Sequence, residues 1–161
     1  MKKALPTAPL DPTRIPVQRE EKLDASNETD YLILVVDDSI DNLTMISLDL
    51  QQSGYRVATA TDGAEALQVA SLTNPDLIIM DLAMPEVDGL ESTRQIRQDA
   101  NLKHIPVIAL TAFSTDGFRR AAHETGFDGY LTKPVDFSRL HDLIGRLIGL
   151  AKSAQSTSSD T

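Results

Sequence analysis

The sequence has no cysteine and no tryptophan, and aromatic residues make up only 4% of its 161 residues. Without cysteine there can be no disulfide bond, thiolate metal site or cysteine nucleophile. A base-stacking platform for single-stranded nucleic acid needs aromatic side chains, and these are scarce here. Long hydrophobic runs are also missing, so no stretch reaches the length of a membrane span. These absences indicate a soluble domain whose chemistry depends on side chains with oxygen or nitrogen groups.

Basic residues are fewer than acidic ones. The chain carries 15 Lys and Arg against 24 Asp and Glu, a net charge of −9. This balance argues against a direct nucleic-acid-binding surface, because phosphate backbones require a basic footprint. Met1-Lys2-Lys3 opens the chain, but no apolar segment follows, so no secretory signal is predicted. We therefore expect a cytoplasmic protein without a membrane or nucleic-acid partner.

The two ends of the chain differ in composition from its centre. Residues 1–30 hold four of the eight prolines and none of the eight glycines, and no sustained periodicity runs through them. This predicts a disordered or extended arm, either a simple tether or a docking arm. Residues 151–161 are rich in Ser and Thr without an apolar pattern, which predicts a flexible tail. One domain with a substantial core is expected over residues 31–150.

Within residues 31–150, short apolar runs alternate with segments of helical periodicity. The runs predict strands at 32–36, 56–60, 77–80, 106–110 and 129–132. A helix is predicted after each strand, the first over about 39–53 and the last from about residue 136. Five strands alternating with five helices indicate an α/β fold, a parallel sheet with helices on both faces.

Local signals place the helix ends and faces. Ser39 is a good N-cap for the first helix, and Ser114 is predicted to cap the fourth, which Gly126 closes. In the third helix, Arg94 and Arg97 are predicted to face solvent.

Polar side chains gather at the carboxyl ends of the predicted strands. Asp37 and Asp38 follow the first strand, Asp81 the third, Thr111 the fourth and Lys133 the fifth. Ligands of open α/β sheets bind at this edge, so the five side chains are expected to share one cleft. Three clustered carboxylates need a counter-ion, and Mg²⁺ suits a few carboxylates with room left for phosphate oxygens. Ca²⁺ is disfavoured because no EF-hand loop spacing is present.

The remaining groups suit phosphoryl chemistry. Lys133 supplies a positive charge and Thr111 a rotatable hydroxyl donor for phosphoryl oxygens. Asp81 can act as a carboxylate nucleophile that forms an acyl phosphate. Taken singly, each residue has an ordinary explanation as a helix cap, a strand residue, a turn residue or a surface charge. The joint pattern at successive strand ends favours a phosphoryl-transfer site.

These motifs resemble the receiver domain of two-component response regulators, of the single-domain chemotaxis type, over about residues 32–150. The matching pieces are Val35-Val36-Asp37-Asp38, Asp81-Leu82-Ala83-Met84-Pro85, Asp88-Gly89, Ile108-Ala109-Leu110-Thr111-Ala112 and Gly129-Tyr130-Leu131-Thr132-Lys133-Pro134. The resemblance implies a flavodoxin-like, doubly wound, five-stranded parallel sheet with strand order 2-1-3-4-5.

The resemblance also implies roles for single residues. Asp81 would accept a phosphoryl group from the phosphohistidine of a sensor histidine kinase or histidine phosphotransfer protein. Asp37, Asp38, Asp81 and the backbone carbonyl of Ala83 would hold Mg²⁺.

The same resemblance assigns the residues on the far side of the cleft. Thr111 and Lys133 would contact the phosphoryl oxygens. Tyr130 would be an aromatic switch residue that turns inward as Thr111 moves toward the phosphate. The Lys133–Pro134 peptide bond would be cis.

The function implied is a phosphorylation switch in phosphorelay signal transduction rather than an enzyme, although the domain would assist its own phosphorylation and dephosphorylation. Phosphorylation would change the surface formed by the fourth helix, fifth strand and fifth helix, which would bind a downstream protein target or form a homodimer. No further module follows residue 150, so a stand-alone receiver or a phosphorelay intermediate is expected. The alternative is the receiver module of a hybrid sensor kinase.

Two other classes compete with this interpretation. Aspartyl-phosphate hydrolases of the haloacid-dehalogenase type use a second Asp two residues after the nucleophile, where this chain has Ala83. A flavodoxin relative would bind a flavin phosphate after the first strand, where Asp37 and Asp38 would repel it.

Overall fold

The computed structural model describes residues 30–82, 89–112 and 115–159, with side chains described as far as Ala151. Five strands alternate with five helices along this part of the chain. The strands are β1 Leu32–Val36, β2 Arg56–Ala60, β3 Leu77–Asp81, β4 Val107–Thr111 and β5 Gly129–Thr132. The helices are α2 Ile40–Gln52, α3 Gly63–Thr73, α4 Gly89–Gln98, α5 Asp116–Thr125 and α6 Phe137–Ser159.

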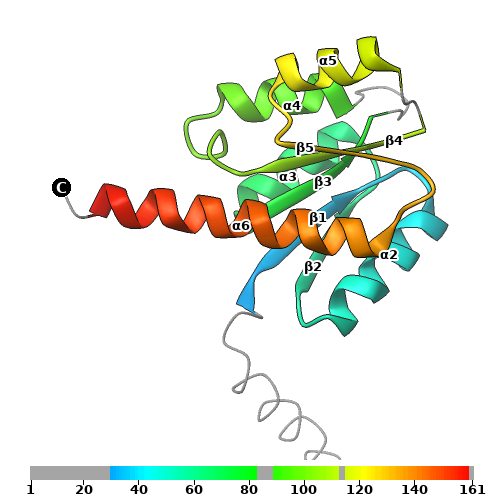
Figure 1. The fold of residues 1–161 in the computed structure, drawn as a ribbon, viewed down its shortest axis with the longest axis horizontal. Coiled ribbons are helices and arrows are strands. Elements are labelled where there is room, and N and C mark those ends of the chain that lie inside the picture. The colour runs from blue at the N-terminus through cyan, green and yellow to red at the C-terminus, as the bar shows by residue number, and fades with distance from the viewer. Residues whose placement is uncertain (1–29, 83–88, 113–114, 160–161) are drawn as a thin grey trace, which may run out of the picture.

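The strands form one parallel sheet in the order β2-β1-β3-β4-β5, and this confirms the predicted fold class (Figure 1). Val36 pairs with Met80 of β3, and Asp81 pairs with Leu110 of β4. The register therefore brings the carboxyl ends of the three central strands level with one another. Asp81 and Thr111 are the last residues of their strands, one residue later than the apolar runs predict.

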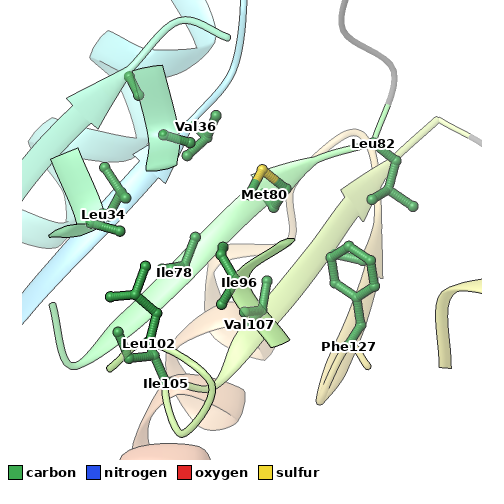
Figure 2. Packing of buried hydrophobic residues seen from close by; sticks show 14 of the residues in the cluster. Leu34, Val36, Ile78, Met80, Leu82, Ile96, Leu102, Ile105, Val107 and Phe127 are labelled. Carbon is green, nitrogen blue, oxygen red and sulfur yellow. The ribbon is translucent and has the colours of Figure 1, made fainter. Parts of the chain in front are cut away.

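Side chains alternate between two cores, one on each face of the sheet. Leu34, Ile78 and Met80 point to the face covered by α3, α4 and α5, where Ile96 of α4 packs against them (Figure 2). The intervening residues, such as Ile79, face α2 and α6. The three central strands are buried on both sides. This explains their nearly unbroken apolar sequences, which are typical of parallel sheets.

Side-chain caps begin α2, α3 and α5, and the sequence predicts the first of them. Ser39 caps α2 by accepting a hydrogen bond from the backbone N–H of Asn42. The prediction that Ser114 caps α5 is wrong, because Thr115 does so by accepting from the N–H of Phe118. Both residue types are good caps, and the choice between neighbours depends on where the connection leaves β4. At the other end, Gly126 closes α5 with a φ of 114°, a conformation that favours glycine.

Arg97 does not face solvent, in contrast to the prediction from helical spacing. Its guanidinium donates to the carbonyl oxygens of Gly126, Lys103 and Ile105 and to the carboxylate of Asp128, at 2.7–2.9 Å. The side chain thus ties α4 to the connections that lead into β4 and β5. These partners lie in loops, so the periodicity of the helix itself carries no sign of them.

The last helix is longer than predicted. It continues to Ser159, although its apolar stripe ends near residue 150, and it projects beyond the sheet (Figure 1). No proline or glycine follows Gly149 to stop it. Across the described residues, no helix is both long and apolar enough to cross a membrane. The predicted arm over residues 1–30 lies almost wholly outside the described residues.

Candidate functional site

The candidate site lies at the carboxyl edge of the sheet. Asp81 ends β3, Thr111 ends β4, and Asp37 and Lys133 directly follow β1 and β5. Because β1, β3, β4 and β5 are consecutive and parallel in the sheet, their ends meet at one edge. The structure thus brings residues from four separate connections to one place, as the sequence predicts.

An acidic cluster forms the centre of the site. One carboxylate oxygen from each of Asp37, Asp38 and Asp81 lies within 4.8 Å of the others. Asp37 and Asp81 are only 1% and 2% exposed, whereas Asp38 is exposed to solvent. Two carboxylates are therefore held in the protein interior, where an ionised group needs hydrogen bonds or a counter-ion.

Hydrogen bonds from the start of α2 fix the Asp37 carboxylate. Its Oδ1 accepts from the backbone N–H of Ser39 at 2.9 Å, and its Oδ2 accepts from the side-chain amide of Asn42 at 3.3 Å. Sequence reasoning missed Asn42 as a site residue. Its position in the first turn of the helix after Asp37 is the signal that could have identified it, since that turn faces the strand end.

Lys133 provides the positive charge. Its Nζ lies 3.2 Å from Oδ2 of Asp37 and 3.3 Å from Oδ2 of Asp81. Burial on its own lowers the pKa of the ammonium, but the Asp81 and Asp37 carboxylates outweigh burial, and the net pKa is raised. The Lys133–Pro134 bond is cis, and the backbone N–H of Lys133 donates to the carbonyl of Thr111 at 2.7 Å.

Thr111 and Tyr130 occupy the β4–β5 side of the sheet. Thr111 is fully buried and lies opposite Thr132 in the β4–β5 ladder. Tyr130 is half-buried, and the guanidinium of Arg119 from α5 lies 5.0 Å from the centre of its ring. Burial raises the pKa of the Tyr130 phenol, and the nearby arginine opposes this in part. Sequence reasoning did not identify the Arg119 contact.

Gly89 allows α4 to pack closely against the end of β3, where Asp81 lies. It is buried at the start of α4, and a Cβ placed there would collide with the carbonyl oxygen of Asp81 and approach Cγ of Met80 to 2.9 Å. Only glycine lets α4 come this close to the end of β3. The position of Asp81 therefore depends on a residue that has no side chain.

The donor set suits a hard divalent cation. Three carboxylates within reach of one another, two of them buried, provide the oxygen ligands that Mg²⁺ prefers. The fourth protein ligand predicted, the backbone carbonyl of Ala83, lies outside the described residues.

Comparison with known proteins gives a consistent result. Residues 33–145 match the family model of the response regulator receiver domain. The polar-differentiation response regulator DivK of Brucella ovis is 37% identical over 117 residues, which cover 73% of this chain and 95% of the relative.

Solved structures agree with the sequence comparison. The receiver domain of the sensor histidine kinase PA1611 from Pseudomonas aeruginosa PAO1 has a TM-score of 0.70 at 38% identity. The match covers 74% of this chain and 98% of that one, and the relative's structure has a magnesium ion coordinated in its active site cleft. Chemotaxis protein CheY4 of Vibrio cholerae also has a TM-score of 0.70, at 35% identity, with 73% of this chain and 98% of that chain covered.

Proposed function

This chain belongs to the response regulator receiver domain family of two-component systems, and from that premise we propose that Asp81 is its phosphoacceptor. The observation that carries the proposal is the contact of the Lys133 ammonium with two buried carboxylates, at 3.2 Å and 3.3 Å. A cation held against Asp37 and Asp81 can also meet the oxygens of an incoming phosphoryl group. The donor would be the phosphohistidine of a sensor histidine kinase or a histidine phosphotransfer protein.

The chemistry follows from the site residues. A carboxylate oxygen of Asp81 attacks phosphorus, a new P–O bond forms, and the P–N bond to the donor imidazole breaks. The imidazole leaves with the bond's electron pair and takes up a proton. Lys133 stabilises the charge on the equatorial phosphoryl oxygens, and the hydroxyl of Thr111 donates to one of them.

Asp37, Asp38 and Asp81 would hold Mg²⁺ together with the Ala83 carbonyl. When bound, the cation neutralises phosphoryl oxygen charge during transfer. Asn42 and the backbone of Ser39 keep the Asp37 carboxylate oriented toward this position.

Apolar side chains on α2 support docking of the donor beside the acceptor. Ile40, Met45 and Leu48 are 63%, 46% and 53% exposed. The helix begins two residues after Asp38, so a protein that covers it would bring its phosphohistidine close to Asp81.

The output is a change of surface. A phosphoryl group on Asp81 adds about two negative charges and draws Thr111 and Lys133 toward new partners. These new contacts shift the equilibrium between two conformations of the surface built from α5, β5 and α6. Tyr130 is the switch residue of this surface. A downstream protein target would read this surface.

Acetyl phosphate tests the proposal. The full chain is incubated with Mg²⁺ and acetyl phosphate, and intact mass is measured before and after treatment at alkaline pH. Wild type should gain one phosphoryl group that is lost in base, as expected of an acyl phosphate. Asp81→Asn should gain none, because the amide is not a nucleophile of this kind.

Asp30→Asn is the matched control. Asp30 lies before β1, at the amino ends of the strands and away from the site, and it is exposed. This variant should therefore be phosphorylated like wild type. A base-labile phosphoryl adduct on Asp81→Asn would show that another residue is the acceptor and would refute the assignment.

A further inference from the structure

A hollow of about 340 Å³ lies at the amino edge of the sheet, the edge opposite to the acidic cluster. Tyr31, Asp76 and Pro106 line it, and they directly precede β1, β3 and β4. The long helix α6 continues past this edge (Figure 1), and its Ile148 and Ala151 line the same hollow. The starts of three strands and the projecting helix therefore border one space, the amino-edge hollow.

Much of the lining of the amino-edge hollow is apolar. Four buried residues contribute to it, namely Pro75, Ile105, Pro106 and Ile148. Tyr31, which is half-buried, lies among the lining residues as well. Proline rings of an extended segment bind to surfaces made of aromatic and other apolar groups. The hollow is thus suited to a proline-rich segment and is large enough for a few of its residues.

The rim of the hollow carries polar groups. Asp76 and His104 line it and are exposed to solvent. Oδ2 of Asp76 accepts a hydrogen bond from the backbone N–H of Leu32 at 2.8 Å, which holds the carboxylate in place. Among the ion pairs of the described residues, none involves Asp76. A carboxylate held in this way can accept hydrogen bonds from a guanidinium that approaches from solvent.

The segment that precedes the hollow in the sequence has a matching pattern. Residues 1–29 lie outside the described residues and are separated from Tyr31 by one residue only. Within them, Pro6, Pro9 and Pro12 recur at every third position. A polyproline II helix has three residues per turn, so in that conformation the three rings would lie along one edge. This spacing predicts a proline edge that matches the apolar lining of the hollow.

The charges of the two parts are opposite. Residues 1–19 contain four basic residues and one acidic residue, whereas residues 20–161 contain 11 basic and 23 acidic residues. Arg14 follows Pro12 by two residues, so a guanidinium comes directly after the proline edge. Attraction between the basic segment and the acidic remainder of the chain favours their encounter, and a contact of Arg14 with Asp76 would fix the register.

We propose that residues 6–14 dock in the amino-edge hollow of the same chain, with the proline edge on the apolar lining and Arg14 on Asp76. Eighteen residues connect Pro12 to Tyr31, and they can span about 60 Å when extended, so the arm is long enough to fold back. Because the segment and the hollow belong to one chain, the high effective concentration of the arm favours even a weak contact.

Docking at this edge leaves the Asp81 end of the sheet accessible to a phosphodonor. A partner protein that binds the hollow or the proline segment has to compete with the contact between them. The inference does not rest on the proposed function, since the hollow and the acidic cluster lie at opposite edges of the sheet.

A spin label tests the inference, and the absence of cysteine makes the labelling site unique. Thr7→Cys places a nitroxide between Pro6 and Pro9 in the full, isotope-labelled chain. Amide signals are recorded by NMR with the nitroxide oxidised and then reduced. The amides of His104 and Ala151 should lose intensity while the label is oxidised, because both residues line the hollow.

Arg56 and Asp38 serve as internal references. Arg56 forms an ion pair with Asp30, the residue that follows the arm, at 3.5 Å. An arm that only moves about its attachment point would broaden the amide of Arg56 at least as strongly as that of Ala151, and this result would overturn the inference. Asp38 belongs to the acidic cluster. Broadening of Asp38 that Mg²⁺ reverses would place the basic arm at that cluster instead.

Pro9→Ala and Pro16→Ala form a matched pair in the labelled chain, because each removes one proline and neither changes a described residue. Pro16 does not follow the three-residue spacing. Pro9→Ala should lower the ratio of docked to free arm about two- to fivefold, since it removes a ring contact and frees the backbone. Pro16→Ala should behave like the parent chain. Equal effects of the two substitutions would refute the role of the proline edge.

A second pair of variants tests the hollow itself. Ala151→Arg places a bulky cation in it and should lower the ratio of docked to free arm about tenfold or more, because the cation repels Arg14. Leu150→Arg adds the same charge at the next position, where the side chain is 62% exposed and does not line the hollow. This control should leave the broadening unchanged. Equal loss in both variants would indicate a general charge effect and would overturn the assignment.

A mixture of spin-labelled chains with isotope-labelled chains that carry no nitroxide reports contacts between copies. Broadening in the mixture as strong as in the doubly labelled chain would assign the hollow to the arm of a second copy. Absence of broadening at His104 and Ala151 would overturn the inference outright. Failure of Asp81 to accept a phosphoryl group would refute the proposed function and leave these results unaffected, so the two proposals are tested independently.

Discussion

Arg97 joins three separate parts of the chain through one side chain. Its guanidinium makes five hydrogen bonds, from Nε and Nη2 to Gly126 and Asp128 and from Nη1 to Lys103 and Ile105. Asp128 in turn accepts from the backbone N–H of Val107 at 2.9 Å. One guanidinium thereby satisfies carbonyl oxygens from two connections at the amino end of β4 and β5.

Replacing Arg97 should destabilise the fold. Arg97→Ala removes all five bonds and leaves partly buried carbonyl oxygens without a donor, which we expect to lower the free energy of unfolding by about 2–4 kcal/mol. Arg97→Lys should recover only a small part of this, because one ammonium cannot reach four acceptor groups. Urea denaturation followed by circular dichroism measures both.

Arg94→Ala is the control for this prediction. Arg94 lies on the same helix and pairs with Glu91 at 3.1 Å on an exposed surface. Its loss should change the free energy of unfolding by no more than about 0.5 kcal/mol. Similar losses at positions 94 and 97 would show that the hydrogen bonds of Arg97 contribute little.

At the scale of the element, Gly89 and Gly145 form a contrasting pair. Both lie in helices, but a Cβ on Gly89 collides with the end of β3, whereas nothing in the described part of the chain lies within 4 Å of a Cβ on Gly145. Gly89→Ala should therefore displace the carbonyl of Asp81, lower stability by more than about 1 kcal/mol and slow phosphorylation by acetyl phosphate. Gly145→Ala should instead stabilise α6 by about 0.5–1 kcal/mol, because it removes only backbone freedom.

Thermal unfolding and the acetyl phosphate reaction distinguish the two glycine variants. If Gly89→Ala is phosphorylated at the wild-type rate and melts like wild type, α4 does not hold the strand end in place. A loss of stability in Gly145→Ala would contradict the open space beside that residue and would mean that another group packs against this side of α6.

Elements were predictable from sequence where the signal is local. Apolar runs such as residues 32–36 predicted the buried strands. Asp37, Asp81 and Lys133 were predicted to lie together because each comes directly after such a run. Features that depend on distant partners were not predictable. Helical spacing places Arg97 on an outer face, and only the fold brings Gly126, 29 residues away, against it.

Boundaries also depend on tertiary context. Ser114 and Thr115 are equally good caps by residue type, and the structure uses Thr115. The apolar stripe of α6 ends near residue 150, but the backbone continues as helix to Ser159 because nothing in the sequence interrupts it. Hydrophobic pattern reports which residues are covered, and it does not report where helical hydrogen bonding stops.

At the scale of the whole molecule, binding of a cation at the acidic cluster should couple to stability. Mg²⁺ that binds the folded chain and not the unfolded one should raise the free energy of unfolding by about 2.7 kcal/mol at a hundred times its Kd. EDTA should reverse the gain. Thermal melts across a Mg²⁺ titration measure it.

Asp38→Asn separates this effect from general salt effects. The exposed Asp38 contributes to the cluster without being part of the core. The variant should melt at or above the wild-type temperature without Mg²⁺, since a repelling charge is gone, and should gain much less from the cation. An Mg²⁺ shift of wild-type size in Asp38→Asn would argue against binding at the cluster.

The pairing of Lys133 with Asp37 spans 96 residues of sequence. A chain still emerging during synthesis has its first acidic residues long before it has the lysine that completes the site. Neither a nascent chain nor a proteolytic fragment ending before β5 can assemble the cation–carboxylate contact. Under the proposed function, an unfinished or truncated copy would lack the cation that meets the phosphoryl oxygens, so it should not compete with intact copies for the phosphodonor.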